Sequence, residues 1–233
     1  MKYVLRKLTT LIITLFIVSL LAFLAFQVIP GSPATSMLGT NATPEKIAAL
    51  EAELAYVTAH KLPLVLCTTG LSSEQIAAVN AAAEMVPIFF SSNMSLGVAV
   101  LSALTKKAAA VLGDTFDIEI VEMHHNQKLD APSGTALMLA DAAKAGLNYE
   151  PESTYDRHSR RQKRDKKEIG IASLRGGTVV GEHSVYFAGE QEVITLSHSA
   201  GSRSVFAGGA LTAAAFIASK AAGMYSMEDI LAD

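Results

Sequence analysis

The chain has little cysteine and no tryptophan, and its charges nearly balance. The single cysteine, Cys67, cannot form a disulfide within the chain or complete a zinc site made of several cysteines. There are 19 lysine and arginine residues against 22 aspartate and glutamate residues, so the formal net charge is −3. This balance argues against a dedicated nucleic-acid-binding protein. We expect no nucleic-acid partner and no metal site.

Glycine-rich phosphate-binding motifs are also missing. No G-x-G-x-x-G spacing occurs anywhere in the sequence. In Rossmann-type proteins, that spacing brings backbone N–H groups and a helix N-terminus against the pyrophosphate of a dinucleotide. The chain therefore has no standard turn for binding a pyrophosphate.

Charged residues are absent from residues 8–29, which are mostly apolar and follow Lys2, Arg6 and Lys7. A helix of this length spans the hydrocarbon core of a bilayer, which is about 30 Å thick. The preceding basic residues favour a cytoplasmic N-terminus. A signal peptide has the same basic start and apolar centre, but the run is long for one and no convincing small-x-small cleavage site follows. We expect one transmembrane helix here, with a cleaved signal as the alternative.

The segment that follows is a different kind of sequence. Residues 30–42 are rich in small residues and helix breakers, which predicts a loop, and a short helix is expected over residues 44–54. Residues 1–27 and the stretch VIPGSPATSMLGTNATPEKIAALEAELA resemble the first span and external segment of dipeptide/oligopeptide ABC transporter permeases. This resemblance covers about residues 1–55. It includes neither the other spans nor the loop that engages an ATPase.

After Tyr56, short apolar runs alternate with helix-like stretches. Strands are expected at residues 62–67, 86–90 and 116–123, with helices at 72–84 and 95–112 capped by Ser72 or Ser73 and by Ser95. This alternation is typical of a parallel α/β sheet. Strands expected at 169–174, 178–187 and 192–198 have no helices between them, which favours antiparallel pairing. A helix over 205–222 is expected near the end.

The densest group of chemically active side chains lies in EMHHNQKLDAPSGTA, residues 122–136. The string starts at the carboxyl end of an expected strand, where open α/β sheets bind their ligands. Two histidines and a lysine lie within five residues, and Ser133-Gly134-Thr135 opens a helix whose N-terminus favours an anion. These features predict a pocket for a small anionic substrate. Taken singly, each residue has an ordinary alternative, such as a solvated histidine or a helix-capping Ser133.

Five stretches keep the order and spacing of one family's motifs. EMHHNQKLDAPSGTA resembles the catalytic motif of dihydrodipicolinate reductases, His-His-x-x-Lys-x-Asp-Ala-Pro-Ser-Gly-Thr-Ala. The other four are CTTG at 67–70, SSNMSLGV at 91–98, RGGTVVGEHSVYF at 175–187 and SRSVFAGGA at 202–210. The similarity runs from about residue 56 to the end of the chain.

The resemblance implies a role for each motif residue. His124 would exchange a proton beside the reacting ring, for which the ordinary pKa of histidine is suitable. Lys128 would donate a proton and place a positive charge near the substrate. The substrate's carboxylates would be held by His125, Ser133, Gly134 and Thr135. The implied reaction is hydride transfer from NADPH or NADH to a cyclic imine with two carboxylates, with loss of water, in lysine (diaminopimelate) biosynthesis.

The nicotinamide side is implied in two other motifs. Its residues would be Cys67, Thr68, Thr69, Ser91, Ser92, Asn93 and Met94. Cys67 and Met94 stand where many family members carry glycine and phenylalanine. Arg203 is either a further carboxylate partner or a structural residue at a helix start.

The expected fold class is α/β, with a truncated Rossmann-like cofactor domain and an α+β substrate domain built on an open mixed sheet, all preceded by one transmembrane helix. We expect a membrane segment at 1–55, the remnant of a dinucleotide-binding domain at 56–94 and 204–233, and a substrate and oligomerisation domain at 95–203. The resemblance implies a homotetramer in the cytoplasm, anchored to a membrane if residues 8–29 span one.

Three functions compete. The first is an NAD(P)H-dependent reductase, impaired by the missing glycine-rich unit. The second is a membrane component of a peptide transporter, based on residues 1–55. The third is a catalytically inactive module that still binds the dicarboxylate and oligomerises. Residues 157–167 hold seven of the 19 basic residues, without interleaved aromatics, and are expected to form a solvated loop rather than a nucleic-acid site.

Overall fold

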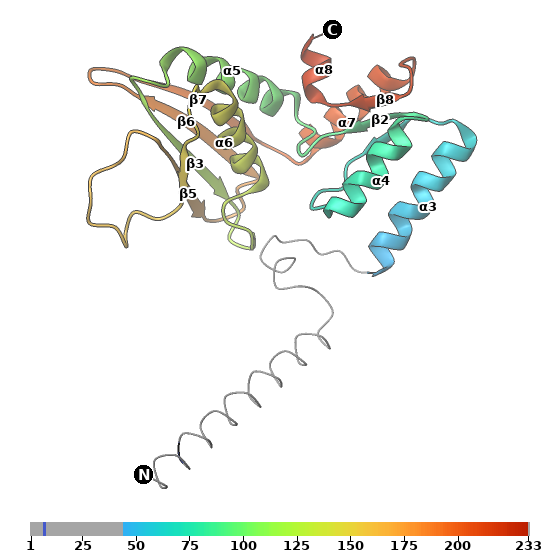
Figure 1. Cartoon of the computed structure of the whole chain (residues 1–233), viewed down its shortest axis with the longest axis horizontal. Helices are drawn as coiled ribbons and strands as arrows, with labels where there is room; N and C mark the ends of the chain where they lie inside the picture. The colour runs from blue at the N-terminus through green and yellow to red at the C-terminus, as the bar shows by residue number, and fades with distance from the viewer. Residues whose placement is uncertain (1–6, 8–43, 233) are drawn as a thin grey trace. The chain divides into compact units, whose positions relative to one another are not determined.

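The computed structural model describes residue 7 and residues 44–232 (Figure 1). From Pro44 onward the chain forms one compact unit. The expected membrane span at residues 8–29 and the loop at 30–42 lie outside the described residues. Among the helices within the described ranges, none is long and apolar enough to cross a bilayer.

A small parallel sheet forms one part of this unit. Its strands β1 (Leu64–Leu66), β2 (Pro87–Phe90) and β8 (Gly223–Tyr225) lie in the order β1-β2-β8. The strand β8 was not expected, and the helix predicted over 205–222 ends at Ile217. The prediction was wrong because three residues that include a glycine give almost no strand signal. The strand forms because β2, distant in sequence, supplies its hydrogen bonds.

The first described helix, α3, runs from Pro44 to His60 and thus continues past Leu54, where it was expected to end. Leu50, Leu54 and Val57 lie on one buried face of this helix and pack in the same apolar cluster as β1 and β2. The position near residue 55, where a domain boundary was expected, therefore lies inside a helix that packs on the small sheet.

The helix between the first two strands, α4 (Ser73–Ala83), begins where the sequence predicted. The Ser72 hydroxyl accepts a hydrogen bond from the Gln75 backbone N–H at 3.3 Å, and the Gln75 side chain accepts one from the Ser72 N–H at 2.9 Å. This reciprocal pair satisfies two N–H groups that the helix itself leaves free.

A five-stranded mixed sheet forms the second part. Its strands are β3 (Asp117–His124), β4 (Glu152–Thr154), β5 (Glu168–Arg175), β6 (Gly181–Ala188) and β7 (Val193–Ala200), in the order β4-β5-β3-β6-β7. The expected antiparallel pairing is confirmed for β6 and β7. It was wrong for β5, which pairs in parallel with both β3 and β4. A helix connects β3 to β5, and such a crossover returns the chain in the same direction.

The connection from β5 to β6 crosses the carboxyl end of β3, because these two strands flank β3 on opposite sides. In this connection the Gly176 N–H donates to the His124 carbonyl at 2.9 Å, and the Asn126 N–H donates to the Gly177 carbonyl at 3.2 Å. Gly177 has a φ of 52°, a conformation that favours glycine. The last residue of β3 is thus held under a tight turn.

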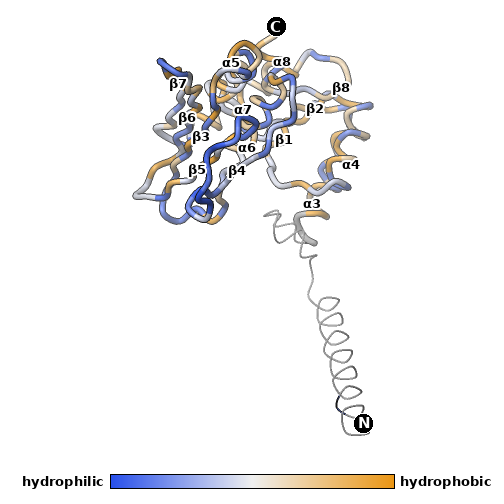
Figure 2. Tube along the Cα trace, turned by 60° about the vertical axis from the view of Figure 1, so that its left-hand side comes forward, coloured by the Kyte–Doolittle hydropathy of each residue, from blue (hydrophilic) through white to orange (hydrophobic). Residues whose placement is uncertain are grey.

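One face of the large sheet is covered by α5 (Leu96–Leu112) and α6 (Gly134–Gly146). Buried and more exposed positions alternate along β3 and β6, which lie side by side in Figure 2, as expected for strands with one covered face. The core beneath the helices is made by Ile118, Ile120, Leu139, Ile169 and Phe187. The same alternation places the last buried positions of β3 at its carboxyl end, beside α6.

The basic stretch at residues 157–167 is exposed at every position except Arg164, as expected of a solvated loop, and arginines tie it to the large sheet. Arg164 is largely buried and donates to Glu119 at 2.9 Å and to Asp117 at 3.0 Å, both on β3. Arg157 bonds the buried Glu168 at 2.7 Å. These arginines are paired with carboxylates of the sheet and tie the loop to it.

Candidate active site

His124, the last residue of β3, lies where three elements meet. The alternation along the strand turns Glu122 and His124 toward the face covered by α6. The β5–β6 connection closes over the strand end, and His183 of β6 places its ring 5.1 Å from the His124 ring in an edge-on contact. The histidine is consequently 9 % exposed, much less than a residue on a solvated loop.

The partner of His124 is the Glu122 carboxylate, which is fully buried. His124 Nδ1 lies 2.5 Å from Glu122 Oε2. Arg175 of β5 donates two hydrogen bonds to the same carboxylate, at 2.9 Å to Oε2 and 2.8 Å to Oε1. The Ser133 backbone N–H donates to Oε1 at 3.2 Å. A buried charge is therefore satisfied by four donors.

The charges at this cluster follow from its burial and its hydrogen bonds. Burial raises the pKa of Glu122, but the hydrogen bonds from Arg175 outweigh it and hold the pKa at about 2. Burial lowers the pKa of His124, against the opposing effect of Glu122. A close carboxylate alone would raise that pKa, but Arg175 already neutralises Glu122, so burial prevails. Burial, and then the nearby His124, lowers the pKa of His183 to about 4.

These protonation states assign the tautomer of His124 at neutral pH. An ionised carboxylate only accepts hydrogen bonds, so the imidazole proton must be on Nδ1. Nε2 is then the nitrogen available for proton exchange. A Cβ on residue 181 would lie 3.1 Å from Nε2, so glycine at this position leaves room beside the reactive nitrogen.

The N-terminus of α6 lies beside this cluster. Ser133 caps the helix, because its hydroxyl accepts from the Ala136 N–H at 3.2 Å, and the same hydroxyl is 3.0 Å from His183 Nε2. A Cβ on Gly134 would meet nothing within 4 Å. The space over the first turn is therefore open, as an anion site at a helix N-terminus requires.

His125 and Lys128 lie on the loop between β3 and α6, and the charge of Lys128 is close enough to lower the pKa of His124. The Lys128 ammonium pairs with the Asp130 carboxylate at 2.8 Å. The Lys128 backbone N–H donates to the His125 carbonyl at 3.1 Å, which closes a turn. The two residues are thus held in a short, hydrogen-bonded loop that leads into α6.

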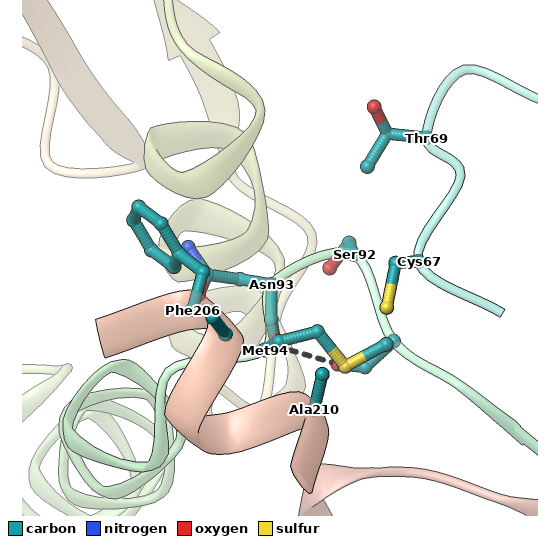
Figure 3. Close-up of a pocket in the computed structure, with 9 residues that line it drawn as sticks. Cys67, Thr69, Ser92, Asn93, Met94, Phe206 and Ala210 are labelled. Carbon is teal, nitrogen blue, oxygen red and sulfur yellow. Dashed lines mark hydrogen bonds between the residues drawn. The ribbon is translucent and has the colours of Figure 1, made fainter. Parts of the chain in front are cut away.

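A cavity of about 370 Å³ opens at the carboxyl ends of β1 and β2 (Figure 3). It is lined by six of the seven residues expected on the nicotinamide side: Cys67, Thr69, Ser91, Ser92, Asn93 and Met94. Thr68 is not among its lining residues. Three lining residues, Phe206, Ala207 and Ala210, come from α7 (Ser204–Ile217) and were not predicted individually. Arg203, at the start of α7, is exposed and makes no capping bond.

A single hydrogen bond joins this cavity to the helix N-terminus. Asn93 Nδ2 donates to the Thr135 hydroxyl at 2.9 Å, and Asn93 Oδ1 accepts from the Ser95 N–H at 2.8 Å. Asn93 therefore both lines the cavity and contacts the first turn of α6.

The cavity suits one end of a nicotinamide cofactor. Ligands of parallel α/β sheets bind at the carboxyl ends of the strands, and the hydroxyl and amide groups around the cavity suit a carboxamide-bearing ring. Within the described ranges no glycine-rich turn follows β1 or β2. The cavity residues therefore fit the nicotinamide ring of the cofactor, without the glycine-rich turn that usually binds its pyrophosphate.

A parallel sheet with a ligand cavity at its carboxyl edge, next to a mixed sheet carrying a histidine–carboxylate cluster, defines a two-part α/β oxidoreductase. Two family models match the chain: dihydrodipicolinate reductase, C-terminus, over residues 97–231, and dihydrodipicolinate reductase, N-terminus, over residues 45–94. The chain belongs to the dihydrodipicolinate reductase family.

Similar proteins carry the same family name. The 4-hydroxy-tetrahydrodipicolinate reductase of Caldanaerobacter subterraneus subsp. tengcongensis is 56% identical over 171 residues, which cover 73% of this chain and 68% of that protein. The one from Clostridium tetani is 50% identical over 182 residues, covering 78% and 71%. A solved structure, dipicolinate-bound dihydrodipicolinate reductase from Paenisporosarcina sp. TG-14, matches with a TM-score of 0.64 at 26% identity, covering 82% and 71%.

The N-terminal family match changes where the reductase region starts. It begins at residue 45, ahead of the expected start near residue 56, and so includes most of α3. The permease resemblance remains a prediction for the residues before this match.

Proposed function

We propose that this chain is a 4-hydroxy-tetrahydrodipicolinate reductase of the lysine (diaminopimelate) pathway. The observation that carries the proposal is the hydrogen bond between Asn93, which lines the cavity, and Thr135, at the N-terminus of α6. A ring bound over α6 would lie beside a nicotinamide in the cavity, with His124 close by. The names of the relatives agree with this reading.

The substrate side is proposed to hold two carboxylates. The free N–H groups of the first turn, at Gly134 and Thr135, attract one of them, because the positive end of a helix dipole favours an anion. His125, Lys128 and the capped Ser133 turn border the same space. Lys128 would exchange its bond to Asp130 for one to the substrate.

A nicotinamide cofactor, NADPH or NADH, supplies a hydride when it is bound in the cavity. In sum, 4-hydroxy-tetrahydrodipicolinate, NAD(P)H and a proton give tetrahydrodipicolinate, NAD(P)⁺ and water. His124 exchanges the proton at Nε2, and Lys128 provides a second acidic N–H for the departing hydroxyl. Burial lowers the pKa of His124, so its imidazole is neutral near pH 7 and can exchange a proton there.

The domain division and assembly are part of the proposal. Residues 56–94 and 204–233 would bind the cofactor and residues 95–203 the substrate. A homotetramer built through the substrate domain's sheet is what the family resemblance implies. A cytoplasmic site of action follows from the cofactor requirement, with a membrane tether if residues 8–29 form a span.

The test is NAD(P)H oxidation by the purified full chain, with the condensation product of pyruvate and aspartate semialdehyde as substrate. Turnover is expected, and His124→Ala or Lys128→Ala should each lower kcat by about 10²- to 10⁴-fold, the usual contribution of a positioned acid or base. His60→Ala, on the exposed end of α3, is the matched control and should keep full activity. A folded chain that binds pyridine-2,6-dicarboxylate without turnover would instead be a substrate-binding module.

A further inference from the structure

We propose that Glu122 is a positioning residue that couples His124 to the substrate-binding end of α6, with Arg175 holding its carboxylate in place. The inference rests on the proposed function, since it takes His124 as the proton-exchanging group. Glu122 itself does not line the cavity, and it meets α6 only at the capping residue Ser133. Its effect passes through the residues that it binds.

The two carboxylate oxygens of Glu122 have different partners. Oε2 faces His124 Nδ1 at 2.5 Å and one Arg175 nitrogen at 2.9 Å. Oε1 faces the other Arg175 nitrogen at 2.8 Å and the Ser133 N–H at 3.2 Å. One oxygen therefore orients the imidazole while the other fixes the residue that caps α6. Movement of either partner is resisted by the same buried group.

Arg175 extends this coupling to the loop that carries Lys128. The arginine nitrogen that bonds Oε1 also donates to the Asp130 carbonyl at 2.6 Å. The Asp130 side chain in turn pairs with the Lys128 ammonium at 2.8 Å. The carboxylate–guanidinium pair of Glu122 and Arg175 is thus connected by hydrogen bonds to His124, to the cap of α6 and to the loop that carries Lys128.

A purely stabilising role is a weak explanation for this pair. Burying two charges costs desolvation free energy that their attraction roughly offsets, so apolar residues of similar volume would serve stability as well. An imidazole is different, because only an acceptor can hold its proton on Nδ1 and leave Nε2 free. An ionised carboxylate only accepts hydrogen bonds and therefore meets this requirement.

The test is a comparison of Glu122→Gln with the unchanged full chain by ¹⁵N NMR of the imidazole nitrogens. Glutamine can keep its oxygen at the Oε1 position, for Ser133 and one Arg175 nitrogen, and place an amide donor at the Oε2 position, where the hydrogen bond from the other Arg175 nitrogen is lost. That donor faces His124 Nδ1 and is expected to shift the proton from Nδ1 to Nε2. In the same variant kcat should fall by about 10²- to 10⁴-fold, with pyridine-2,6-dicarboxylate still bound.

The control is Glu119→Gln, on the same strand but the opposite face, where the carboxylate pairs with Arg157 and Arg164. It loses a comparable ion pair and should leave the His124 tautomer and kcat unchanged. An Nδ1-protonated His124 in Glu122→Gln, with kcat near that of the unchanged chain, would overturn the proposal. If the unchanged chain shows no turnover, the proposed function fails, and the tautomer comparison still decides the positioning role.

Arg175→Lys covers the case in which Glu122→Gln does not fold. Lysine keeps the positive charge but cannot form the two-pronged bond. The titratable groups near His124 are Glu122, Arg175, Lys128 and the neutral His183, so weaker neutralisation of Glu122 should raise the pKa of His124 while its Nδ1 proton stays. The acid limb of kcat/KM would then move to higher pH. An unmoved limb would contradict the proposal.

Discussion

His183 shows how much of the site is decided by single buried side chains. Its ring is 4 % exposed, contacts His124 edge-on and reaches the Ser133 hydroxyl, while its Nδ1 has no partner among the described residues. Burial holds such a ring neutral, although the nearby Glu122 carboxylate favours its charged form. The cost of protonating it falls on the folded state alone.

We therefore predict an acid-sensitive fold. The pKa of His183 is about 4 in the folded chain against 6.5 ordinarily. A lowered pKa means that the unfolded chain takes up the proton first, so the free energy of unfolding falls as the pH drops from 6.5 toward 4, by on the order of 3 kcal/mol in full. Urea unfolding at pH 7 and pH 5 measures this.

The variant that checks it is His183→Gln, which should flatten the pH dependence between pH 7 and pH 5. Some dependence should remain, because burial also lowers the pKa of His124. Glu122 does not interfere, because its pKa of about 2 confines its effect to more acidic solutions. His60→Gln should behave as the unchanged chain; an identical slope in His183→Gln would refute the prediction.

For the cluster around His124, sequence reasoning identified the residues of one continuous string and assigned no role to their partners. His124, Lys128 and the Ser133–Thr135 turn all lie within the motif and are found together around the start of α6. Glu122 stands in the same string but reads as an ordinary strand residue. Arg175 and His183 come from other strands, and only the register of β5 and β6 against β3 brings them to His124. Nothing in local spacing reveals that register.

At the scale of elements, α7 packs unusually close to the turn after β2. A Cβ on Gly209 would lie 1.6 Å from the Met94 carbonyl oxygen, which is backbone and cannot move aside alone. The neighbouring Gly208 has no such contact within 4 Å. Only one of the two adjacent glycines is therefore required by packing.

This pair gives a matched prediction. Gly209→Ala should push α7 away from Met94, lower the melting temperature and weaken ligand binding in the cavity that both elements line. Gly208→Ala should stabilise the chain by about 0.5–1 kcal/mol, since alanine favours a helix interior more than glycine does. Thermal unfolding of both variants decides the matter. Equal melting temperatures would mean that the close contact is not a constraint.

Most elements were predictable where the local pattern was strong. The alternating β3, the capped α4 and α5, and the strands β6 and β7 all occur close to their expected positions. The parallel placement of β5, the short β8 and the last turns of α3 were not predicted. Each depends on a neighbour distant in sequence, which supplies hydrogen bonds or an apolar surface that a local reading does not contain.

At the scale of the whole molecule, the two halves differ in how completely they carry their ligand-binding groups. The mixed sheet holds the entire cluster around His124 and the open end of α6. The small sheet has the cavity for a nicotinamide ring, but the sequence has no G-x-G-x-x-G to bind a pyrophosphate. Much of a dinucleotide's affinity comes from that contact.

We accordingly predict that the dicarboxylate binds more tightly than the nicotinamide cofactor. In calorimetric titrations of the full chain, pyridine-2,6-dicarboxylate should bind measurably, whereas NADPH and NADH should bind weakly even when the dicarboxylate is present. Thr135→Val should weaken binding of the dicarboxylate. Tight NADPH binding, in the micromolar range or better, would show that other residues replace the missing turn.

The turn that passes over the end of β3 has a consequence for how the site comes into being. The catalytic strand is flanked on one side by β5 and on the other by β6, and both are made later during synthesis. A nascent chain that has released only β3 and α6 has the whole signature string but an unfinished pocket, with the strand edges still unpaired. Since pairing between segments so far apart forms slowly, activity should arise late, after both β6 and the cavity-lining helix α7 have left the ribosome. Chains truncated before that point would contain the motif but show no activity.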